Sequence, residues 1–581
     1  MLTALSEIEK EKWMVRLLWL ASVCGILAFA TLLWEIGWPL SHSVFLTIRY
    51  ITWAVVICAA LAEFGLLYLH YKRAHLWRLC ILVALPFLGL SQLVFGESLA
   101  WLIDVIFPKK SVPYIALGIV QLTLVFPSAV RLLRLMRDQR WFQSIPPALL
   151  GLVSFALLIV FGTCLLKTPN ATVGGISWLD ACFTSASAVC VTGLSTLNIE
   201  TQLTFTGQAI LLFLIQVGGL GVVTLAYFLA LMAGQGINLR DRVALRDLLS
   251  EDNMGKVGRF VWHIIFATLL IESIGILLLR YFWQDTHIQQ NRLWWDAIFH
   301  SISAFCNAGF STYGAGLMHE SLVENRPVQA VIMVLIILGG FGFALFSELT
   351  RYLIAVLRRI KCQQRIPLPR LTVHSRVAMV TTACLLFFGW LFFFLCGNHS
   401  WEALFNSVSC RTAGFNISNF GDHTVGALMV ALTLMFVGGN PGGTAGGIKT
   451  TTLAICLMEI LRVLRGRNDL NLWDRRVARD AVERSVVIVL LALLWCTAAS
   501  AFVGQWNPEL KAADVIFECV SAFGTVGLSR GITSQLSDPS KMVIILTMFC
   551  GRVGILAFFL TLFGRGKTLP YRLPETRVPL G

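Results

Sequence analysis

Four short segments of the sequence share residues whose backbone could coordinate a cation. Each begins with an acidic residue, has a phenylalanine three positions later, and ends in a glycine followed by Leu or Phe; they are residues 180–196, 296–312, 402–417 and 514–530. Glycine allows close approach of chains and dihedral angles that other residues avoid. Four such loops around one axis can offer rings of carbonyl oxygens that replace the hydration shell of a cation.

The four segments recur at a regular distance. Their glycines are Gly193, Gly309, Gly414 and Gly527, roughly 110 residues apart, which is the signature of a repeated structural unit. The repeat predicts four similar units around one axis. The alternative is four re-entrant hairpins that only pack against their neighbours.

The elements that must position these segments are membrane helices. The chain of 581 residues is 57% hydrophobic and 13% charged, with a mean hydropathy of +0.75, which is typical of a polytopic membrane protein. Its 15 cysteines contain no C-x-x-C pair, so they read as small core residues. The apolar run near the N-terminus is longer than the core of a signal peptide and is interpreted as the first span.

About twelve spans are predicted. Four come early, at residues 13–34, 44–69, 78–96 and 113–131, and eight follow at 146–166, 205–233, 258–282, 327–357, 373–396, 424–461, 482–504 and 540–563. The four glycine segments lie between alternate pairs of the later spans. Each is too short to cross a bilayer, so we expect a short helix that enters partway and a non-helical return. The acids at their starts, Asp180, Asp296, Glu402 and Asp514, would lie near the positive end of each helix dipole.

Most of the 46 Lys and Arg residues fall on one side of this topology, which places both termini in the cytoplasm. Three basic residues, Arg411, Lys449 and Arg552, lie instead within the membrane part, where charge is expensive and usually functional.

The predicted span 424–461 is interrupted by "GGNPGGTAGGIKTT", which is not a Walker phosphate loop because Ile448 precedes Lys449. Together with the four units, this stretch resembles the TrkH/KtrB/HKT superfamily of potassium transporters, in its bacterial KtrB/TrkH branch. The resemblance implies an all-α polytopic membrane protein with four M1–P–M2 pore units in one chain and, here, about four extra N-terminal helices. The expected divisions are 1–140 for the extra helices, then 141–235, 236–360, 361–470 and 471–581 for the pore units.

The resemblance implies a potassium selectivity filter built from the four glycine segments. Its residues would be Val191, Thr192, Gly193, Asn307, Ala308, Gly309, Thr412, Ala413, Gly414, Thr525, Val526 and Gly527. In the plant relatives of this superfamily, serine at the first filter glycine accompanies a preference for sodium. All four positions here are glycine, which favours potassium.

The resemblance also implies that the loop 438–450 is an intramembrane gate beneath the filter. The expected gate residues are Gly438, Gly439, Asn440, Gly442, Gly443, Thr444, Gly446, Gly447, Lys449 and Arg552, the last matching the mid-pore arginine of the family. The alternative is that Arg552 and Lys449 are structural and paired with acids such as Glu459 or Glu348.

Other polar residues near the segments are expected to have structural roles. We expect Arg411 to orient the third filter loop, and Cys190, Cys306 and Cys410 to pack behind the loops rather than bind a metal. His300 and Glu518 are expected to make packing or polar contacts. In the N-terminal part, arginines recur at every third position from Arg131 to Arg140, which suggests either a voltage sensor, with Glu63 as countercharge, or positive-inside anchoring.

The sequence predicts a potassium uptake protein of the bacterial cytoplasmic membrane. K⁺ would be the transported ion, with no organic cofactor, no nucleic acid and no enzymatic motif. A Na⁺- or H⁺-coupled K⁺ symporter and a less selective monovalent cation transporter remain alternatives. By resemblance, the chain would form a homodimer on a cytosolic nucleotide-binding RCK subunit of the KtrA/TrkA type, with the basic stretches 351–376 and 462–484 as candidate docking surfaces.

Overall fold

The computed structural model describes residues 7–39, 41–70, 147–221, 257–283, 290–362 and 371–563. This part of the chain is helical, except for a hairpin of two short strands, β1 (Asn471–Leu472) and β2 (Arg475–Arg476). The predicted helical class is therefore confirmed. The predicted spans 78–96 and 113–131 and the arginine series 131–140 lie outside the described residues.

The helices follow one another as pairs of long helices with a short helix between them. After α1 (Glu7–Gly37) and α2 (His42–His70), the first group is α7 (Pro147–Leu166), α8 (Trp178–Val189), α9 (Ile199–Gln202) and α10 (Phe205–Gly219). The second is α13 (Val257–Phe282), α14 (Gln290–Cys306), η3 (Gly316–Met318), α15 (Glu320–Val323), α16 (Arg326–Gly340) and α17 (Phe343–Cys362). The third is α18 (Val373–Leu395), α19 (Ser400–Ser409), α20 (Val425–Phe436) and α21 (Thr450–Leu464), and the fourth is α22 (Arg479–Trp506), α23 (Ala512–Gly524), η4 (Thr533–Gln535), α24 (Asp538–Val553) and α25 (Ile555–Phe563).

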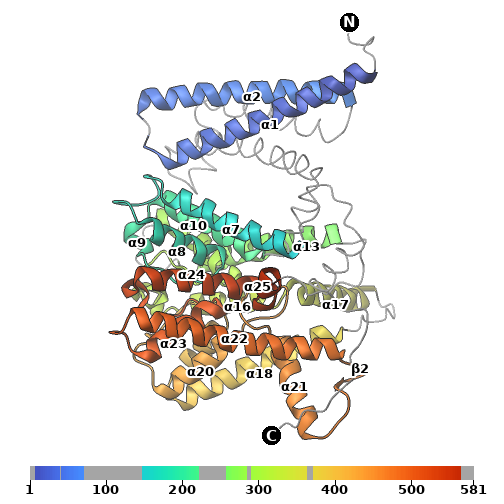
Figure 1. Ribbon diagram of the computed structural model, residues 1–581, viewed down its shortest axis with the longest axis vertical. Coiled ribbons are helices and arrows are strands. Elements are labelled where there is room, and N and C mark those ends of the chain that lie inside the picture. The colour runs from blue at the N-terminus through green and yellow to red at the C-terminus, as the bar shows by residue number, and fades with distance from the viewer. Residues whose placement is uncertain are drawn as a thin grey trace.

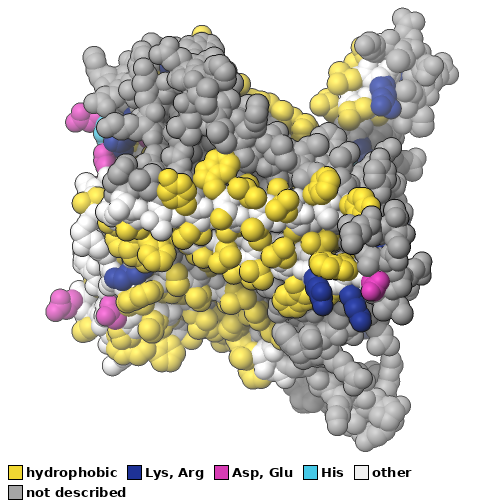
Figure 2. All heavy atoms as spheres, turned by 90° about the horizontal axis from the view of Figure 1, so that it is seen from above, with side chains coloured by type: hydrophobic (Ala, Val, Ile, Leu, Met, Phe, Trp, Pro, Cys, Tyr) yellow, Lys and Arg dark blue, Asp and Glu magenta, His cyan; other side chains and the backbone are white. Residues whose placement is uncertain are grey.

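The helices are apolar on their outer faces. Within the described ranges, four helices are long and apolar enough to cross a membrane, or six spans if two bent helix pairs are each taken as one. Figure 2 shows a broad apolar surface with charged side chains gathered towards its two ends. Side chains such as Leu494, which is 67% exposed, have no protein partner to cover them. In a bilayer this surface contacts hydrocarbon.

The two N-terminal helices pack against each other (Figure 1), and α1 contacts the first group. The end of α1 is fixed by Asn170, whose backbone N–H and side-chain amide donate to the carbonyls of Gly37 and Ile36 at 3.0 and 3.2 Å. The rings of Phe29 and Phe161 stack with centroids 5.8 Å apart. The N-terminal helix α1 is thus anchored to the first of the repeated groups.

The four short helices α8, α14, α19 and α23 fall on the predicted glycine segments. Asp180, Glu402 and Asp514 lie in the first turns of their helices, as predicted. The prediction is wrong for Asp296, because α14 begins earlier, at Gln290. Asp296 is instead fully buried and accepts hydrogen bonds from Thr312 (2.7 Å) and Tyr313 (2.9 Å).

Two predicted continuous spans are broken in the structure. The predicted span 327–357 is divided into α16 and α17, whose axes differ by 105°, and 540–563 is divided into α24 and α25, which differ by 102°. The breaks fall at Gly342 and Gly554, which have φ angles of +83° and +96°. An α-helix cannot continue through a residue in that conformation. The turns were missed because the residues on both sides of each glycine are apolar and the hydropathy does not change there.

Candidate functional site

Each short helix ends in a turn with an unusual backbone, and these four turns are called the glycine loops below. The residue two positions before each glycine has a positive φ: Val191 (+57°), Asn307 (+60°), Thr412 (+75°) and Thr525 (+51°). The glycines have φ of +98°, +67°, +78° and +91° in chain order. Positive φ in β-branched residues is rare and costs about 1–3 kcal/mol at each position. Such a conformation persists only where the surroundings impose it.

The four glycine loops meet in a closed ring. At each glycine, an added Cβ would fall against the carbonyl oxygen just before the glycine of another loop. The distances are 2.5 Å for Gly193 to Ala308, 2.7 Å for Gly309 to Ala413, 2.3 Å for Gly414 to Val526 and 2.1 Å for Gly527 to Thr192. The fourth contact returns to the first loop, so the order closes on itself. No side chain fits at any of the four positions, and this requirement explains the four glycines.

A buried serine in each short helix shapes the adjoining loop, and sequence reasoning missed it. The Ser187 and Ser521 hydroxyls accept from the N–H groups of Gly193 and Gly527, both at 3.1 Å. Ser303 donates to the carbonyl of Phe310 at 2.8 Å, and Ser409 donates to that of Phe415. All four serines stand four residues after the phenylalanine of their segment, a repeat visible in the sequence.

The contacts with these serines fix the orientation of the backbone N–H groups in the glycine loops. The backbone N–H groups of Thr192, Ala308 and Val526 also donate back to the carbonyls of Ser187, Ser303 and Ser521, at 2.7 to 2.9 Å. The loop donors are therefore engaged by their own helix. The carbonyls that face the neighbouring loops are left as acceptors, which is the chemistry that a dehydrated cation requires.

The outer ends of two of the short helices, α8 and α23, are held by charge pairs. Lys541 of α24 donates to Asp180 of α8 at 2.8 Å, and Arg530 pairs with Asp514. Burial opposes the ionisation of Asp180, but hydrogen bonds from Lys541 and Ser177 outweigh it and keep the pKa of this carboxyl below its usual value. These acids serve the packing of the helices.

A glycine-rich loop, residues 437–449, connects α20 to α21. Its two ends are joined by a bridge between Val437 and Ile448, with the Gly438 N–H donating to the Ile448 carbonyl at 2.9 Å. Its tip approaches the glycine loops: a Cβ added at Gly446 would lie 2.2 Å from the Thr525 hydroxyl, and the Thr444 hydroxyl donates to the Phe305 carbonyl at 3.3 Å.

The glycine-rich loop is bonded to the second and fourth groups of helices. The N–H groups of Asn440 and Thr444 donate to the carbonyls of Gly340 and Gly339, at 3.1 and 3.2 Å. The Gly447 N–H donates to Gly551 at 3.1 Å. These bonds fix the loop without any of its side chains.

Asn440 is the main side-chain anchor of the glycine-rich loop. It is buried, donates to the Phe341 carbonyl at 3.0 Å, and accepts from the hydroxyls of Thr382 (3.1 Å) and Thr450. It therefore ties the loop to α16, α18 and α21.

Two cations, the buried Arg552 and the partly buried Lys449, also hold the glycine-rich loop. Arg552 donates to the Thr444 carbonyl and, at 2.5 Å, to the Gly218 carbonyl, while Lys449 donates to the Ala445 carbonyl at 2.6 Å. Neither forms an ion pair with a carboxylate in the described ranges. The two acids named as possible partners are engaged elsewhere: Glu459 binds Arg462 at 2.6 Å, and Glu348 accepts from Thr372 at 2.9 Å.

Other predicted residues lie beside the glycine loops. Arg411 reaches past its own loop and donates to the Gly438 carbonyl at 3.3 Å. His300 bonds to Ser311 at 2.9 Å, and Glu518 accepts from Thr533. Cys190, Cys306 and Cys410 are buried, and the described part of the chain holds no cluster of three His, Cys, Asp or Glu residues suited to a metal.

A second glycine repeat was missed by sequence reasoning. It lies at the end of the long helix after the first, second and fourth glycine loops, and reads Gly-Gly-x-Gly at 218–221 and 339–342, and Gly-Arg-Val-Gly at 551–554. The first glycine of each packs on its own short helix. An added Cβ at Gly218, Gly339 or Gly551 would lie only 2.1, 1.8 or 1.9 Å from a carbonyl oxygen there. Arg552 thus occupies a position where two other groups have glycine.

Comparison with known proteins accounts for most of the chain. A family model described as "TrkH: Cation transport protein" matches residues 134–564. The chain is 32% identical to the Ktr system potassium uptake protein B of Bacillus subtilis over 453 residues, covering 76% of this chain and 98% of that protein. It is also 32% identical to the potassium/sodium uptake protein NtpJ of Enterococcus hirae over 458 residues, with the same two coverages. The crystal structure of the potassium transporter TrkH from Vibrio parahaemolyticus matches with a TM-score of 0.59 and 16% identity, covering 84% of this chain and 98% of that one.

Proposed function

Because the chain belongs to the TrkH family of cation transport proteins, we propose that it takes up K⁺ across a bacterial cytoplasmic membrane through a filter made by the four glycine loops. The chain is an ion transporter of this family and not an enzyme. The filter would consist of the carbonyls of the residues from Val191 to Gly193 and of their counterparts in the other three loops. Four helix–loop–helix units would surround it.

The observation that carries this proposal is the closed ring of glycine contacts. In each loop the N–H group just before the glycine is engaged by its own short helix, and the carbonyl of that same residue lies against the glycine of a neighbouring loop. A ring of carbonyl dipoles without fixed negative charge suits a monovalent cation that must both enter and leave.

The glycine-rich loop would act as the gate. It lies against the glycine loops, and its backbone bonds connect it to two other groups of helices. Arg552 would add a positive charge that opposes K⁺ while the loop is in this position. Opening then requires the loss of the loop's hydrogen bonds and the withdrawal of Ile448 from the hydrophobic core.

A coupled or less selective mechanism is the second candidate. The relative from Enterococcus hirae is named a potassium/sodium uptake protein and is as similar as the Bacillus subtilis one. Movement of Na⁺ or H⁺ with K⁺ would therefore fit the family. Flux of K⁺ against its own gradient, driven by an imposed Na⁺ or pH gradient, would establish coupling.

We further propose that the chain is one component of a larger system. Two relatives are named as proteins of Ktr systems, which favours a separate regulatory subunit. The partner would be a cytosolic nucleotide-binding protein of the RCK class, and the transporter itself would be a homodimer. Both termini would face the cytoplasm.

The filter is tested by ion flux through the purified protein in liposomes. We expect the wild type to carry K⁺ in preference to Na⁺. In Gly527→Ser, the new side chain must displace the Thr192 carbonyl, only 2.1 Å from its Cβ, so K⁺ flux should fall at least about tenfold or lose its selectivity.

Gly504→Ala is the matched control. Gly504 lies in α22 with open space around it, so the added methyl meets nothing and flux should be unchanged. If Gly527→Ser carried K⁺ with the rate and selectivity of the control, the glycine ring would not be the filter.

A further inference from the structure

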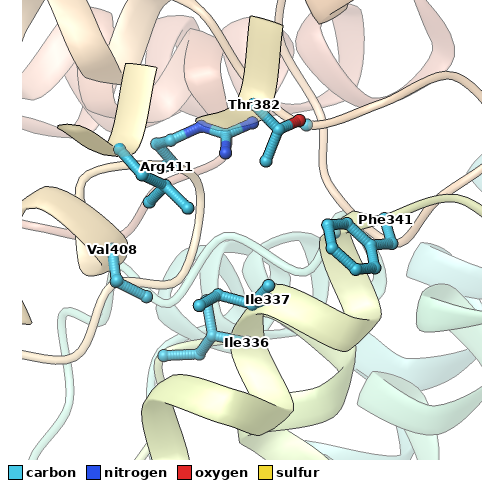
Figure 3. A pocket seen from close by; sticks show the side chains of 9 residues that line it. Ile336, Ile337, Phe341, Thr382, Val408 and Arg411 are labelled. Carbon is cyan, nitrogen blue, oxygen red and sulfur yellow. The ribbon is translucent and has the colours of Figure 1, made fainter. Parts of the chain in front are cut away.

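A small cavity lies at the boundary between the second and third groups of helices. It has a volume of about 20 Å³ and is lined by Ile336, Ile337, Gly340, Phe341, Thr382, Leu386, Val408, Arg411 and Gly439. Figure 3 shows the Arg411 guanidinium beside Thr382 at one end of the cavity, across from Ile337. The lining is otherwise apolar side chain and glycine backbone. A single positively charged group therefore dominates this space.

The guanidinium has more donors than partners. Arg411 is only 8% exposed, and it makes one hydrogen bond, from Nη2 to the Gly438 carbonyl at 3.3 Å. Its Nε is buried with no partner. Within the described ranges it forms no ion pair with a carboxylate. A guanidinium has five N–H donors, and a buried charge without a counterion is strongly unfavourable.

The lining offers no second side-chain donor. Thr382 lies in the cavity wall, but its hydroxyl donates to Asn440. The Thr382 hydroxyl can therefore only accept a further hydrogen bond, and Arg411 is the donor that a ligand in the cavity would meet.

We propose that this cavity binds one small monovalent anion of halide size, held by the Arg411 guanidinium. A water molecule requires roughly 10–15 Å³ of such space, so 20 Å³ admits one ion but not a phosphate or a lipid headgroup. Water fits by size but does not neutralise the guanidinium. The anion supplies the missing counterion, and the apolar walls suit a weakly hydrated halide.

The anion would also steady the glycine-rich loop. Arg411 bonds to Gly438, the first glycine of the loop, and Gly439 lies in the cavity wall. Binding therefore fixes the guanidinium that holds this end of the loop. This effect concerns the folded protein and does not depend on which cation is transported.

The site is tested by the melting temperature of the purified full chain in detergent. Chloride or bromide is titrated against gluconate, at constant K⁺ concentration and ionic strength. A ligand that binds only the folded state stabilises it by mass action. We expect a saturable rise in melting temperature with either halide and none with gluconate, which is too large for the cavity.

Two variants and a control make the result specific. Arg411→Gln removes the charge, and Leu386→Phe fills the cavity while keeping Arg411; both should abolish the halide-dependent rise. Arg484→Gln, at a side chain that is 69% exposed, should retain it. Should Arg411→Gln fail to fold, Leu386→Phe decides the question alone.

A halide-dependent rise that persists in Leu386→Phe, or its absence from the wild type, would overturn the proposal. Bromide anomalous diffraction from crystals gives an independent measurement: a peak beside Arg411 is expected. Ordinary water density there, with bromide bound elsewhere, would show that the cavity holds only water. K⁺ flux enters neither measurement, so a failed filter hypothesis would leave this test intact.

Discussion

Arg552 joins parts of the chain that are far apart in sequence. Its guanidinium donates to carbonyls of Thr444, in the glycine-rich loop, and Gly218, at the end of α10. It is 8% exposed, and no carboxylate in the described ranges pairs with it. The residue therefore has two effects: it bonds the loop in place, and it leaves a net positive charge beneath the glycine loops.

Arg552→Gln should increase K⁺ flux. At an effective dielectric constant of about 20, a unit charge 4 Å from a K⁺ ion raises its energy by about 4 kcal/mol. Loss of even about 1.4 kcal/mol of this barrier gives a tenfold increase, and the freed loop adds to it. The measurement is K⁺ uptake into liposomes at a fixed protein density.

Arg462→Gln is the control, because Arg462 pairs with Glu459 near the end of α21, away from the glycine loops. Its flux should match that of the wild type. Unchanged or reduced flux in a well-folded Arg552→Gln protein would contradict the gating role.

At the scale of elements, variants at the two helix breaks can separate the effect of backbone strain from the effect of displacing the glycine-rich loop. Gly342 and Gly554 both have positive φ, so an alanine at either position strains the backbone by about 1–3 kcal/mol. Their surroundings differ. A Cβ at Gly342 would lie 2.6 Å from the Pro441 carbonyl of the glycine-rich loop, whereas a Cβ at Gly554 would meet nothing within 4 Å.

We therefore expect both alanine variants to be destabilised, Gly342→Ala the more because its Cβ also meets Pro441, and only Gly342→Ala to alter K⁺ flux. Thermal melting in detergent measures the first effect, and liposome uptake measures the second. Equal changes of flux in the two variants would mean that strain at the break, and not displacement of the glycine-rich loop, controls transport.

The sequence predicted the positions of the helices but not all of the breaks within them. Hydropathy located the long helices, and the repeat located the short ones, because both depend on local composition. The break at the glycine-rich loop was predicted from its composition. Those at Gly342 and Gly554 were not, since one glycine among apolar residues barely changes hydropathy.

At the candidate site, residue types could be predicted but not partners. The four filter glycines stand out by their spacing, whereas the closed order of their contacts depends on the packing of distant helices. The cavity beside Arg411 likewise forms where the second and third groups of helices meet. The four serines and the second glycine repeat were different: they recur in the sequence and could have been found there.

At the scale of the whole molecule, the apolar surface should tolerate charge only outside the bilayer. Leu494 lies near the middle of α22 and is 67% exposed; Trp473, in the hairpin between β1 and β2, is 52% exposed. Lysine at the centre of a span costs about 2.5–3.5 kcal/mol. Leu494→Lys should therefore reduce the amount of folded protein in membranes.

Trp473→Lys is the control, at an exposed residue of the segment that connects α21 to α22. It removes a cation–π contact with Arg376 worth about 0.5–1 kcal/mol at an exposed site, and should therefore be tolerated far better than Leu494→Lys. Yield in the membrane fraction and melting temperature are the measurements. Equal behaviour of the two variants would contradict the assignment of α22 as a lipid-facing span.

The closed ring of glycine contacts has a consequence for biosynthesis. The contact between Gly527 and Thr192 joins the last loop to the first, and the roughly 330 residues between them take on the order of half a minute to translate. During that time the first loop lies in the membrane without its final neighbour. The bonds from Ser187 to its own loop are local and can form as soon as α8 does. Each glycine loop can thus acquire its backbone conformation while translation continues. Assembly ends when the fourth glycine loop contacts the third and the first.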